Sequence, residues 1–125
     1  MIRTFYSVMV LICLLACQQP TSAKISAEKL KEMQEEGVLV VDIRTAKEYA
    51  EGHIPGVIEN VDYLQSDFLK QMAQFDKAAP IIIHCARGGR SGKAAKMLQE
   101  AGFEDIYDYV GGFSDWKARG EEIEK

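Results

Sequence analysis

Histidine and cysteine are scarce in this chain, and their scarcity excludes several kinds of site. The 125 residues include two histidines and three cysteines. Cys13 and Cys17 lie in an apolar N-terminal stretch, which leaves Cys85 as the one thiol in the rest of the chain. One thiol with His53 and His84 does not suffice for a zinc site, and Cys85 has no partner for an intramolecular disulfide. We therefore expect no metal.

Positive charge is also in short supply. The chain has 15 Lys and Arg against 19 Asp and Glu, a net charge of -4. A nucleic-acid-binding surface needs a basic face, so we expect no nucleic-acid partner. The sequence contains no internal repeat and no low-complexity segment. Its composition, 47% hydrophobic and 27% charged, is typical of one ordinary globular domain.

The chain lacks an apolar run long enough to span a bilayer. Its longest, Val8–Ala16, is short and follows Arg3, a pattern typical of an export signal. We therefore interpret residues 1–23 as a signal peptide and tether, and residues 24–125 as the folded domain. This interpretation places the protein in a bacterial cell envelope, facing the periplasm.

Two positions compete as the end of this leader. Leu14 to Cys17 resembles the lipobox of bacterial lipoproteins, in which the cysteine is acylated and becomes the mature N-terminus. Residues 18–23 would then form a polar tether. The small residues of Thr21–Ala23 form an ordinary cleavage site instead, which would release a soluble periplasmic protein. We favour the lipobox, because its cysteine directly follows a small residue at the end of the apolar core. The lipid would then be the only membrane contact.

The residues around Cys85 predict a strand, a tight loop and a helix. Ile81–Ile83 is a branched apolar run of the kind found in strands buried on both faces of a parallel sheet. Apolar residues recur at helical spacing from Ser91 to Gly102. The loop between them carries two arginines and two glycines: Arg87, Gly88, Gly89 and Arg90. The sequence thus places a cysteine between the end of a strand and the start of a helix.

This placement predicts a reactive thiol. Guanidinium groups and the unpaired N–H groups of a helix N-terminus favour the thiolate, and the glycines allow successive amides to turn inward as an anion-binding nest. The alternative is a buried packing cysteine, which would not need such a loop. His84 precedes Cys85, but neighbours on a strand point to opposite faces, so we expect His84 to be structural.

Strands and helices alternate along the rest of the chain. Helices are expected over residues 26–36, 45–51, 64–75 and after Gly112, and strands over residues 38–43, 57–61 and 106–110. Such alternation predicts an α/β fold with a mostly parallel sheet and helices on both faces. Ligands of these sheets bind at the carboxyl ends of strands, where Asp42, Arg44 and Cys85 are expected. We interpret Asp42 and Arg44 as ion-pair or hydrogen-bond supports of this rim.

Five motifs, taken together, resemble the single-domain rhodaneses, a family of sulfurtransferases. They occur in the family's order over most of the chain: Asp42–Arg44, Glu48–Tyr49, Gly52–Gly56, Cys85–Arg90, and Gly111–Gly112 with Trp116. The resemblance implies a three-layer fold with a five-stranded sheet. It also implies that the loop amides cradle a persulfide on Cys85, with these binding residues: Ala86, Arg87, Gly88, Gly89, Arg90 and Ser91.

The resemblance implies ping-pong transfer of sulfur through Cys85. Thiosulfate or a persulfide would be the donor, cyanide or a thiol the acceptor, and no cofactor is needed. Arg87 is our choice for attracting the anionic donor, while Arg90 either shares that role or holds the shape of the loop. We expect a monomer.

Two alternatives to a sulfurtransferase enzyme remain open. The related phosphatases and arsenate reductases have a loop one residue longer, whereas four residues separate Cys85 from Arg90 here. A tetrahedral phosphate or arsenate needs a wider ring of amides than a single sulfur atom, so this loop favours sulfur. The other alternative is a carrier module, in which Cys85 delivers sulfur to a partner without efficient turnover.

Overall fold

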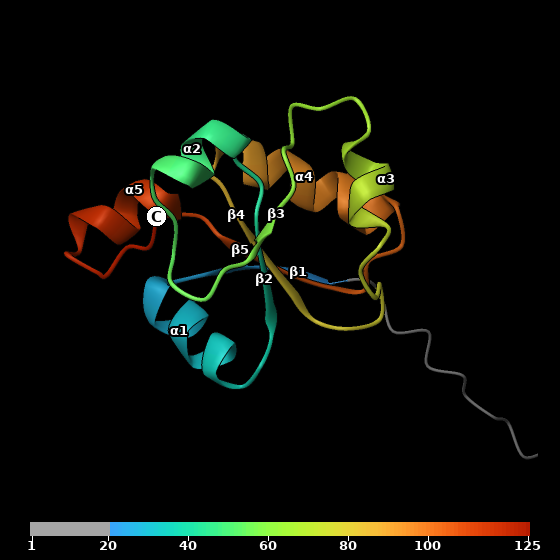
Figure 1. Cartoon of the computed structure of the whole chain (residues 1–125). Helices are drawn as coiled ribbons and strands as arrows, with labels where there is room; N and C mark the ends of the chain where they lie inside the picture. Colours follow the sequence, from blue (N-terminus) through green and yellow to red (C-terminus); the bar gives the residue numbers. More distant parts are fainter. Residues whose placement is uncertain (1–20) are drawn as a thin grey trace, which may run out of the picture.

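A five-stranded, entirely parallel sheet forms the middle layer of the structure, a computed structural model that describes residues 21–125 (Figure 1). The strand order is β1-β5-β4-β2-β3. The strands are β1 (Thr21–Ile25), β2 (Leu39–Asp42), β3 (Glu59–Asn60), β4 (Ile81–His84) and β5 (Asp105–Tyr109). The predicted α/β class, parallel sheet and five strands are confirmed.

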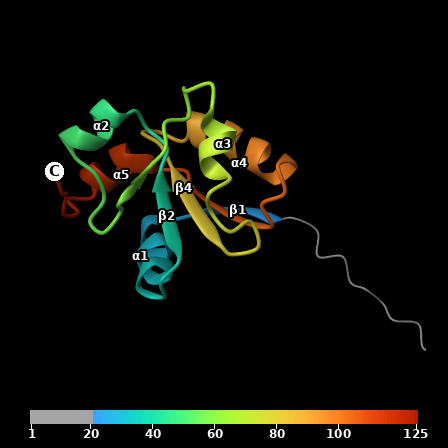
Figure 2. The same cartoon turned by 45° about the vertical axis from the view of Figure 1, so that its right-hand side comes forward.

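Helices cover both faces of the sheet, which gives three layers (Figures 1 and 2). One apolar core lies between the sheet and two helices, α3 (Phe68–Met72) and α4 (Gly89–Glu100). The other core lies between the sheet and α1 (Ala27–Glu35) with α5 (Gly112–Ala118). The short helix α2 (Ala46–Glu51) buries no residue in either core.

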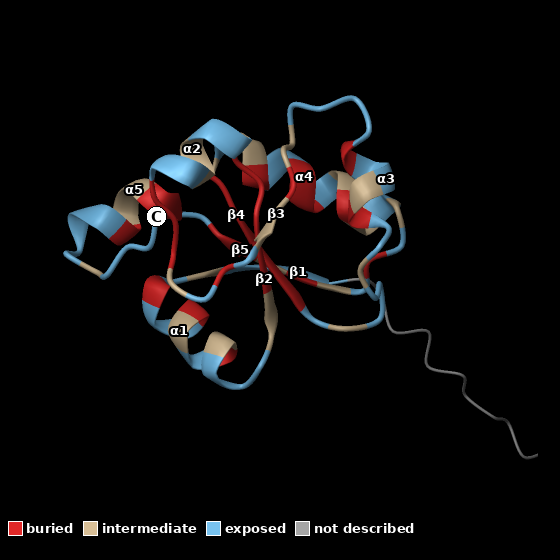
Figure 3. Ribbon diagram, viewed as in Figure 1, coloured by how far each residue is buried: buried red, intermediate tan, exposed pale blue. Residues whose placement is uncertain are grey.

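Strand β4 lies at the centre of the sheet and is buried on both faces (Figure 3). Ile81 and Ile83 pack under α3 and α4, while Ile82 points into the opposite core. Successive side chains of a strand alternate between faces, so a strand covered on both sides needs apolar residues without interruption. This burial fixes β4, and with it the position of Cys85 at its end.

Two predicted helix starts are confirmed by their capping contacts. The Ser26 hydroxyl accepts a hydrogen bond from the Lys29 amide at the start of α1. Thr45 and Glu48 form a reciprocal capping box at the start of α2. These contacts satisfy backbone N–H groups that lack partners inside the helix.

Strand β1 corrects the predicted domain boundary. Thr21, Ser22 and Ala23 were assigned to the tether, but they belong to β1 and pair in register with Asp105, Ile106 and Tyr107 of β5. Four of the five β1 residues are exposed, so this edge strand has no apolar alternation that would reveal it. Backbone hydrogen bonding to β5 holds it instead. Residues 1–20, which include the lipobox and Cys17, lie outside the described residues.

Three other elements differ from their predicted bounds by two residues or more at one end. The helix expected over residues 64–75 is confined to α3, because the Asp62 side chain accepts a hydrogen bond from the Leu64 amide and stabilises a turn there. The strand expected over residues 57–61 shortens to β3, where the Asn60 side chain bonds the carbonyls of Asp42 and Arg44. Helix α4 begins at Gly89 rather than at Ser91.

Within residues 21–125, none of the helices combines the length and the apolar character that crossing a membrane requires.

Candidate active site

Cys85 lies directly after β4, at the carboxyl end of the sheet, and is 1% exposed. Its side chain belongs to the core under α4, whereas His84 contacts the opposite core through the ring of Tyr109. His84 therefore does not face the sulfur. Burial lowers the pKa of its imidazole, which keeps the ring neutral and agrees with its predicted structural role.

Backbone amides converge on the Cys85 sulfur. The amide of Gly88 lies 3.1 Å from Sγ and that of Ser91 lies 3.4 Å from it. Burial by itself raises the pKa of the Cys85 thiol, but hydrogen bonds from Ser91, Arg87 and Gly88 outweigh burial and hold this pKa below its ordinary value. The loop therefore favours an anionic sulfur at this position.

Two glycines allow the loop to close around the sulfur. Gly88 has a φ of +90°, and a Cβ added there would lie 2.5 Å from the Val110 carbonyl oxygen. Gly112 has a φ of +66°, and its Cβ would lie 2.5 Å from the Ala86 carbonyl oxygen. This close approach lets the amides of Phe113 and Ser114 donate to the carbonyls of Cys85 and Ala86, each at 2.9 Å. Helix α5 thus fixes the loop carbonyls while the loop amides turn toward the sulfur.

Arg90 closes the loop by pairing with Glu48 of α2. Its Nη1 and Nη2 lie 2.7 and 2.9 Å from the two carboxylate oxygens, a bidentate arrangement. The hydrogen bonds from Arg90 lower the pKa of Glu48 to about 2. Of the two roles predicted for Arg90, this contact corresponds to holding the shape of the loop.

The predicted ion pair between Asp42 and Arg44 is confirmed. Arg44 Nη2 lies 2.7 Å from Asp42 Oδ2, and both side chains are buried. The same nitrogen donates to the Gly52 carbonyl at 2.8 Å, and the Arg44 guanidinium lies 4.1 Å from the centre of the Phe113 ring. This pair joins β2 to the Gly52 turn and to α5, so it supports the rim of the site.

A pocket of about 430 Å³ opens at the Cys85 loop. Tyr63 and Leu64 form an apolar part of its wall, and the side chain of Leu64 is largely exposed. Three cations, Arg87, Arg90 and Lys93, also line the pocket. Arg90 is neutralised by Glu48, whereas Arg87 and Lys93 form no salt bridge within residues 21–125. The pocket thus offers two uncompensated positive charges beside the sulfur.

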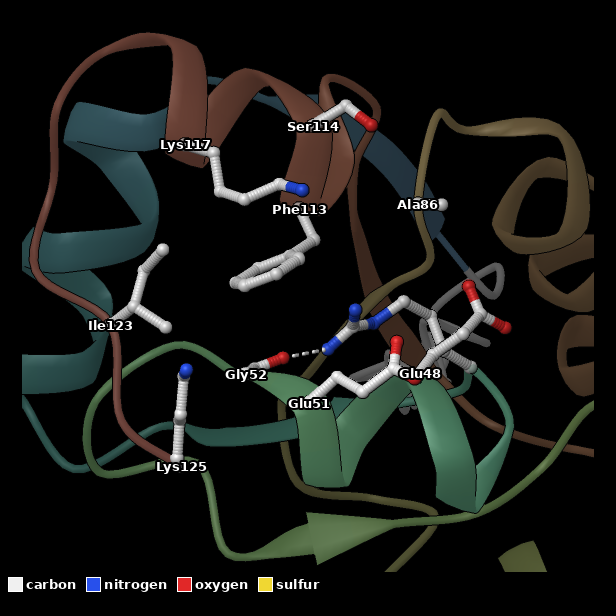
Figure 4. A pocket seen from close by; sticks show the side chains of 10 residues that line it. Glu48, Glu51, Gly52, Ala86, Phe113, Ser114, Lys117, Ile123 and Lys125 are labelled. Atoms are coloured by element: carbon white, nitrogen blue, oxygen red, sulfur yellow. Dashed lines mark hydrogen bonds between the residues drawn. The ribbon is translucent and has the colours of Figure 1, made fainter.

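A second pocket of about 420 Å³ lies on the other side of the Glu48–Arg90 pair. Figure 4 shows Glu48 and Glu51 of α2 facing Phe113 and Lys117 of α5 across it. Ala86 lines both pockets. The two hollows therefore flank the Cys85 loop.

The structure brings the predicted loop residues together around Cys85, but several pocket residues were missed. Glu48 belongs to the Glu48–Tyr49 motif and to a predicted capping box, but its contact with Arg90 was not predicted, because it spans 42 positions. Leu64 falls in the helix expected over residues 64–75, and Tyr63, directly before it, was not singled out. Lys93 carried a usable signal, because it lies four residues after Gly89 and therefore on the same face of α4.

Within residues 21–125, no three His, Cys, Asp or Glu side chains are grouped so that they could hold a metal ion.

Comparisons with known proteins agree with this geometry. The family model described as Rhodanese-like domain matches residues 26–119. A protein named Thiosulfate sulfurtransferase GlpE from Pseudomonas fluorescens is 38% identical over 96 residues, which cover 75% of this chain and 84% of that protein. A protein of the same name from Pseudomonas aeruginosa is 35% identical over 98 residues, covering 78% and 86% of the two chains.

Solved structures show the same fold. The crystal structure of a rhodanese-like domain protein from Staphylococcus aureus is 30% identical, with a TM-score of 0.67, and the match covers 82% of this chain and 96% of that one. The human single-domain sulfurtransferase TSTD1 is 19% identical, with a TM-score of 0.65 over 77% and 96% of the two chains, and shows the fold alone. The relatives support a sulfurtransferase activity in general terms, and the chain belongs to the rhodanese-like domain family.

Proposed function

We propose that the protein transfers sulfane sulfur from thiosulfate, or from a persulfide, to a thiophilic acceptor through a persulfide on Cys85. The Cys85 thiolate attacks the outer sulfur of thiosulfate, the S–S bond of the donor breaks, and sulfite leaves with the electron pair. Cyanide or a thiolate then attacks the outer sulfur of the persulfide, and the Cys85 thiolate is restored.

The observation that carries this proposal is the convergence of the Arg87, Gly88 and Ser91 amides on a buried sulfur. These donors are fixed before the reaction and stabilise an anionic sulfur without reorganising, as an oxyanion hole does for oxygen. The uncompensated charges of Arg87 and Lys93 suit an anionic donor. The name of the Pseudomonas relatives points to the same donor, thiosulfate.

Steady-state kinetics test the proposal. When initial rates are measured against thiosulfate concentration at several fixed cyanide concentrations, the double-reciprocal plots should be parallel. The protein should release sulfite and thiocyanate in equal amounts. Cys85→Ser should abolish both products while remaining folded. Hydrolysis of an aryl phosphate that depends on Cys85, without thiocyanate formation, would instead identify a phosphatase. Persulfide formation followed by slow release to cyanide would identify a carrier.

We also propose that the leader ends at the lipobox and that Cys17 is acylated. What supports this end over cleavage after Ala23 is the position of β1, since the later cleavage would remove Thr21–Ala23 from the sheet. Radiolabelled palmitate should be incorporated into the wild-type protein but not into Cys17→Ala, and globomycin should cause the precursor to accumulate. A wild-type protein that incorporates no label would contradict the proposal.

A further inference from the structure

The imidazole ring of His84 is completely buried, and the proposed sulfur transfer does not use it. Its Nδ1 lies 3.1 Å from the carbonyl oxygen of Cys85, while its Nε2 has no hydrogen-bond partner within residues 21–125. An unpaired polar atom in a protein interior is destabilising. An apolar side chain would fill the same space without that loss, so the contact with Cys85 is what distinguishes histidine at this position.

The surroundings of the ring determine where its hydrogen lies. A carbonyl oxygen only accepts hydrogen bonds, so the Nδ1 of His84 carries a hydrogen and donates it to Cys85. The Nε2 lies 3.7 Å from Asp42 Oδ2, which is too far for a hydrogen bond. Burial and the charge of Arg44 lower the pKa of His84, and Asp42 and the bond to Cys85 oppose this shift without cancelling it. The ring is therefore neutral, with its one hydrogen on Nδ1.

The Cys85 carbonyl accepts a second hydrogen bond, from the Phe113 amide at 2.9 Å. A carbonyl oxygen has two lone pairs, so the two donors occupy both of them and fix the plane of the peptide between Cys85 and Ala86. That peptide is the first of the loop, and the loop then turns back to place the Gly88 amide 3.1 Å from Sγ. The orientation of the carbonyl therefore limits where the later amides lie.

We propose that His84 is a positioning residue for the Cys85 loop: its Nδ1–H holds the Cys85 carbonyl and so keeps the loop amides directed at the sulfur. His84 does not touch the sulfur, and no proton or other group is transferred. Without this donor, the carbonyl keeps only the Phe113 bond and the peptide can rotate. The amides of Gly88 and Ser91 then lie within hydrogen-bond distance of Sγ for less of the time, so the thiolate loses stabilisation. The inference assumes the thiolate of the proposed function, but not thiosulfate as the donor.

Three substitutions at His84 distinguish this role from simple packing. In His84→Asn the amide nitrogen takes the place of Nδ1 and can still donate to the Cys85 carbonyl. In His84→Gln the amide lies one bond further from the backbone and cannot replace that donor. His84→Leu fills the buried space but donates no hydrogen bond. If the ring served only to fill space, Asn would be the most disruptive of the three, because it leaves the largest cavity.

The rate at which iodoacetamide alkylates Cys85, measured against pH by mass spectrometry, tests the inference. His84→Leu and His84→Gln should raise the midpoint by about half a pH unit or more, whereas His84→Asn should stay close to wild type. His53→Leu is the matched control, because it removes a similar contact between a ring nitrogen and a carbonyl, that of Tyr49 at 3.0 Å. It should leave the midpoint unchanged. An unchanged midpoint in His84→Leu, or a larger shift in His84→Asn than in His84→Leu, would overturn the inference.

A second measurement needs no substitution at His84. The chain has two histidines, so long-range 1H–15N correlation spectra of 15N-His-labelled protein contain two rings, and His53→Leu assigns the signals of His84. The His84 ring should carry its hydrogen on Nδ1 and stay neutral as pH falls below 6.5, the ordinary pKa of histidine. A hydrogen on Nε2, or a charged ring at neutral pH, would contradict the inference. Neither measurement uses a sulfur donor, so a failure of the proposed function would be seen separately.

Discussion

At the scale of single residues, the donors around the Cys85 sulfur are mostly backbone amides, so side-chain substitutions leave them in place. The two arginine side chains of the loop have different roles. Arg90 forms an ion pair with Glu48, with a nitrogen–oxygen distance of 2.7 Å. Arg87 lines the same pocket and is exposed. Attraction of an anionic donor therefore depends on cations that have no carboxylate beside them.

Lys93 is expected to act as such a cation. Lys93→Gln should raise the KM for thiosulfate about threefold to tenfold and leave kcat nearly unchanged, because the charge attracts the donor without contacting the sulfur. The effect should shrink as ionic strength rises. Lys96→Gln is the matched control, since Lys96 is exposed on the same helix but does not line the pocket. Equal effects of the two substitutions would refute a specific role for Lys93.

Contacts close in sequence were predictable at this scale, and distant ones were not. Asp42 and Arg44 are two positions apart at a strand end, so their pairing follows from local geometry. The loop amides likewise follow from the strand, the glycines and the helix. Glu48 meets Arg90 only because α2 lies beside the start of α4 in the folded protein, and no local pattern carries that information.

At the scale of elements, the junction between β4 and α4 depends on the backbone of Gly88. An alanine there requires a left-handed φ and brings Cβ to 2.5 Å from the Val110 carbonyl oxygen. Gly88→Ala should therefore lower the free energy of unfolding by roughly 2–4 kcal/mol and reduce alkylation of Cys85. Urea unfolding measures the first effect and iodoacetamide labelling the second.

Gly89 provides the matched control for Gly88. It is the first residue of α4, and an added Cβ meets nothing within 4 Å. Gly89→Ala should leave the stability unchanged or increase it by up to about 1 kcal/mol. Similar losses at both positions would show that the left-handed backbone is not the determinant.

Strand β1 gives a second prediction at this scale. A chain that begins at Lys24 lacks Thr21–Ala23 and the backbone hydrogen bond from Thr21 to Glu104. Such a chain should unfold at lower urea concentration than one beginning at Gln18, with a loss of about 1–3 kcal/mol. Equal midpoints would mean that these residues do not stabilise the sheet.

The elements that the sequence predicted best are those buried on one or both faces. Ile81–Ile83 and the apolar face of α4 carry patterns that burial imposes, and both were located to within about two residues. β1 is held by its backbone, and the turn at Asp62 is set by a side chain that competes with helix formation. Neither feature produces a periodic pattern of apolar residues in the sequence. Strand β1 was therefore missed, and the start of α3 was misplaced.

At the scale of the whole molecule, His84 and Glu48 both contribute to the dependence of the stability on pH. Burial lowers the pKa of His84, so its contribution is fully present above the unfolded pKa near 6.5 and is lost as pH falls below it. The pKa of Glu48 falls from 4.5 to about 2, so its contribution is present above 4.5 and is lost as pH falls toward 2. Urea unfolding across this range should show a decline in two stages.

Glu48→Gln separates the two stages. The variant should keep the decline that begins near pH 6.5 and lack the part between pH 4.5 and 2. Because Glu48 is partly exposed, the lost contribution should be no more than about 1 kcal/mol. An unchanged lower stage would mean that another carboxyl group is responsible for it.

The measurement that tests the central claim most directly is the intact mass of the protein after exposure to thiosulfate. The account predicts a gain of one sulfur atom that is absent in Cys85→Ser, and its rapid loss as thiocyanate when cyanide is added. A wild-type mass that does not change, or a gain that persists in Cys85→Ser, would contradict a persulfide on Cys85.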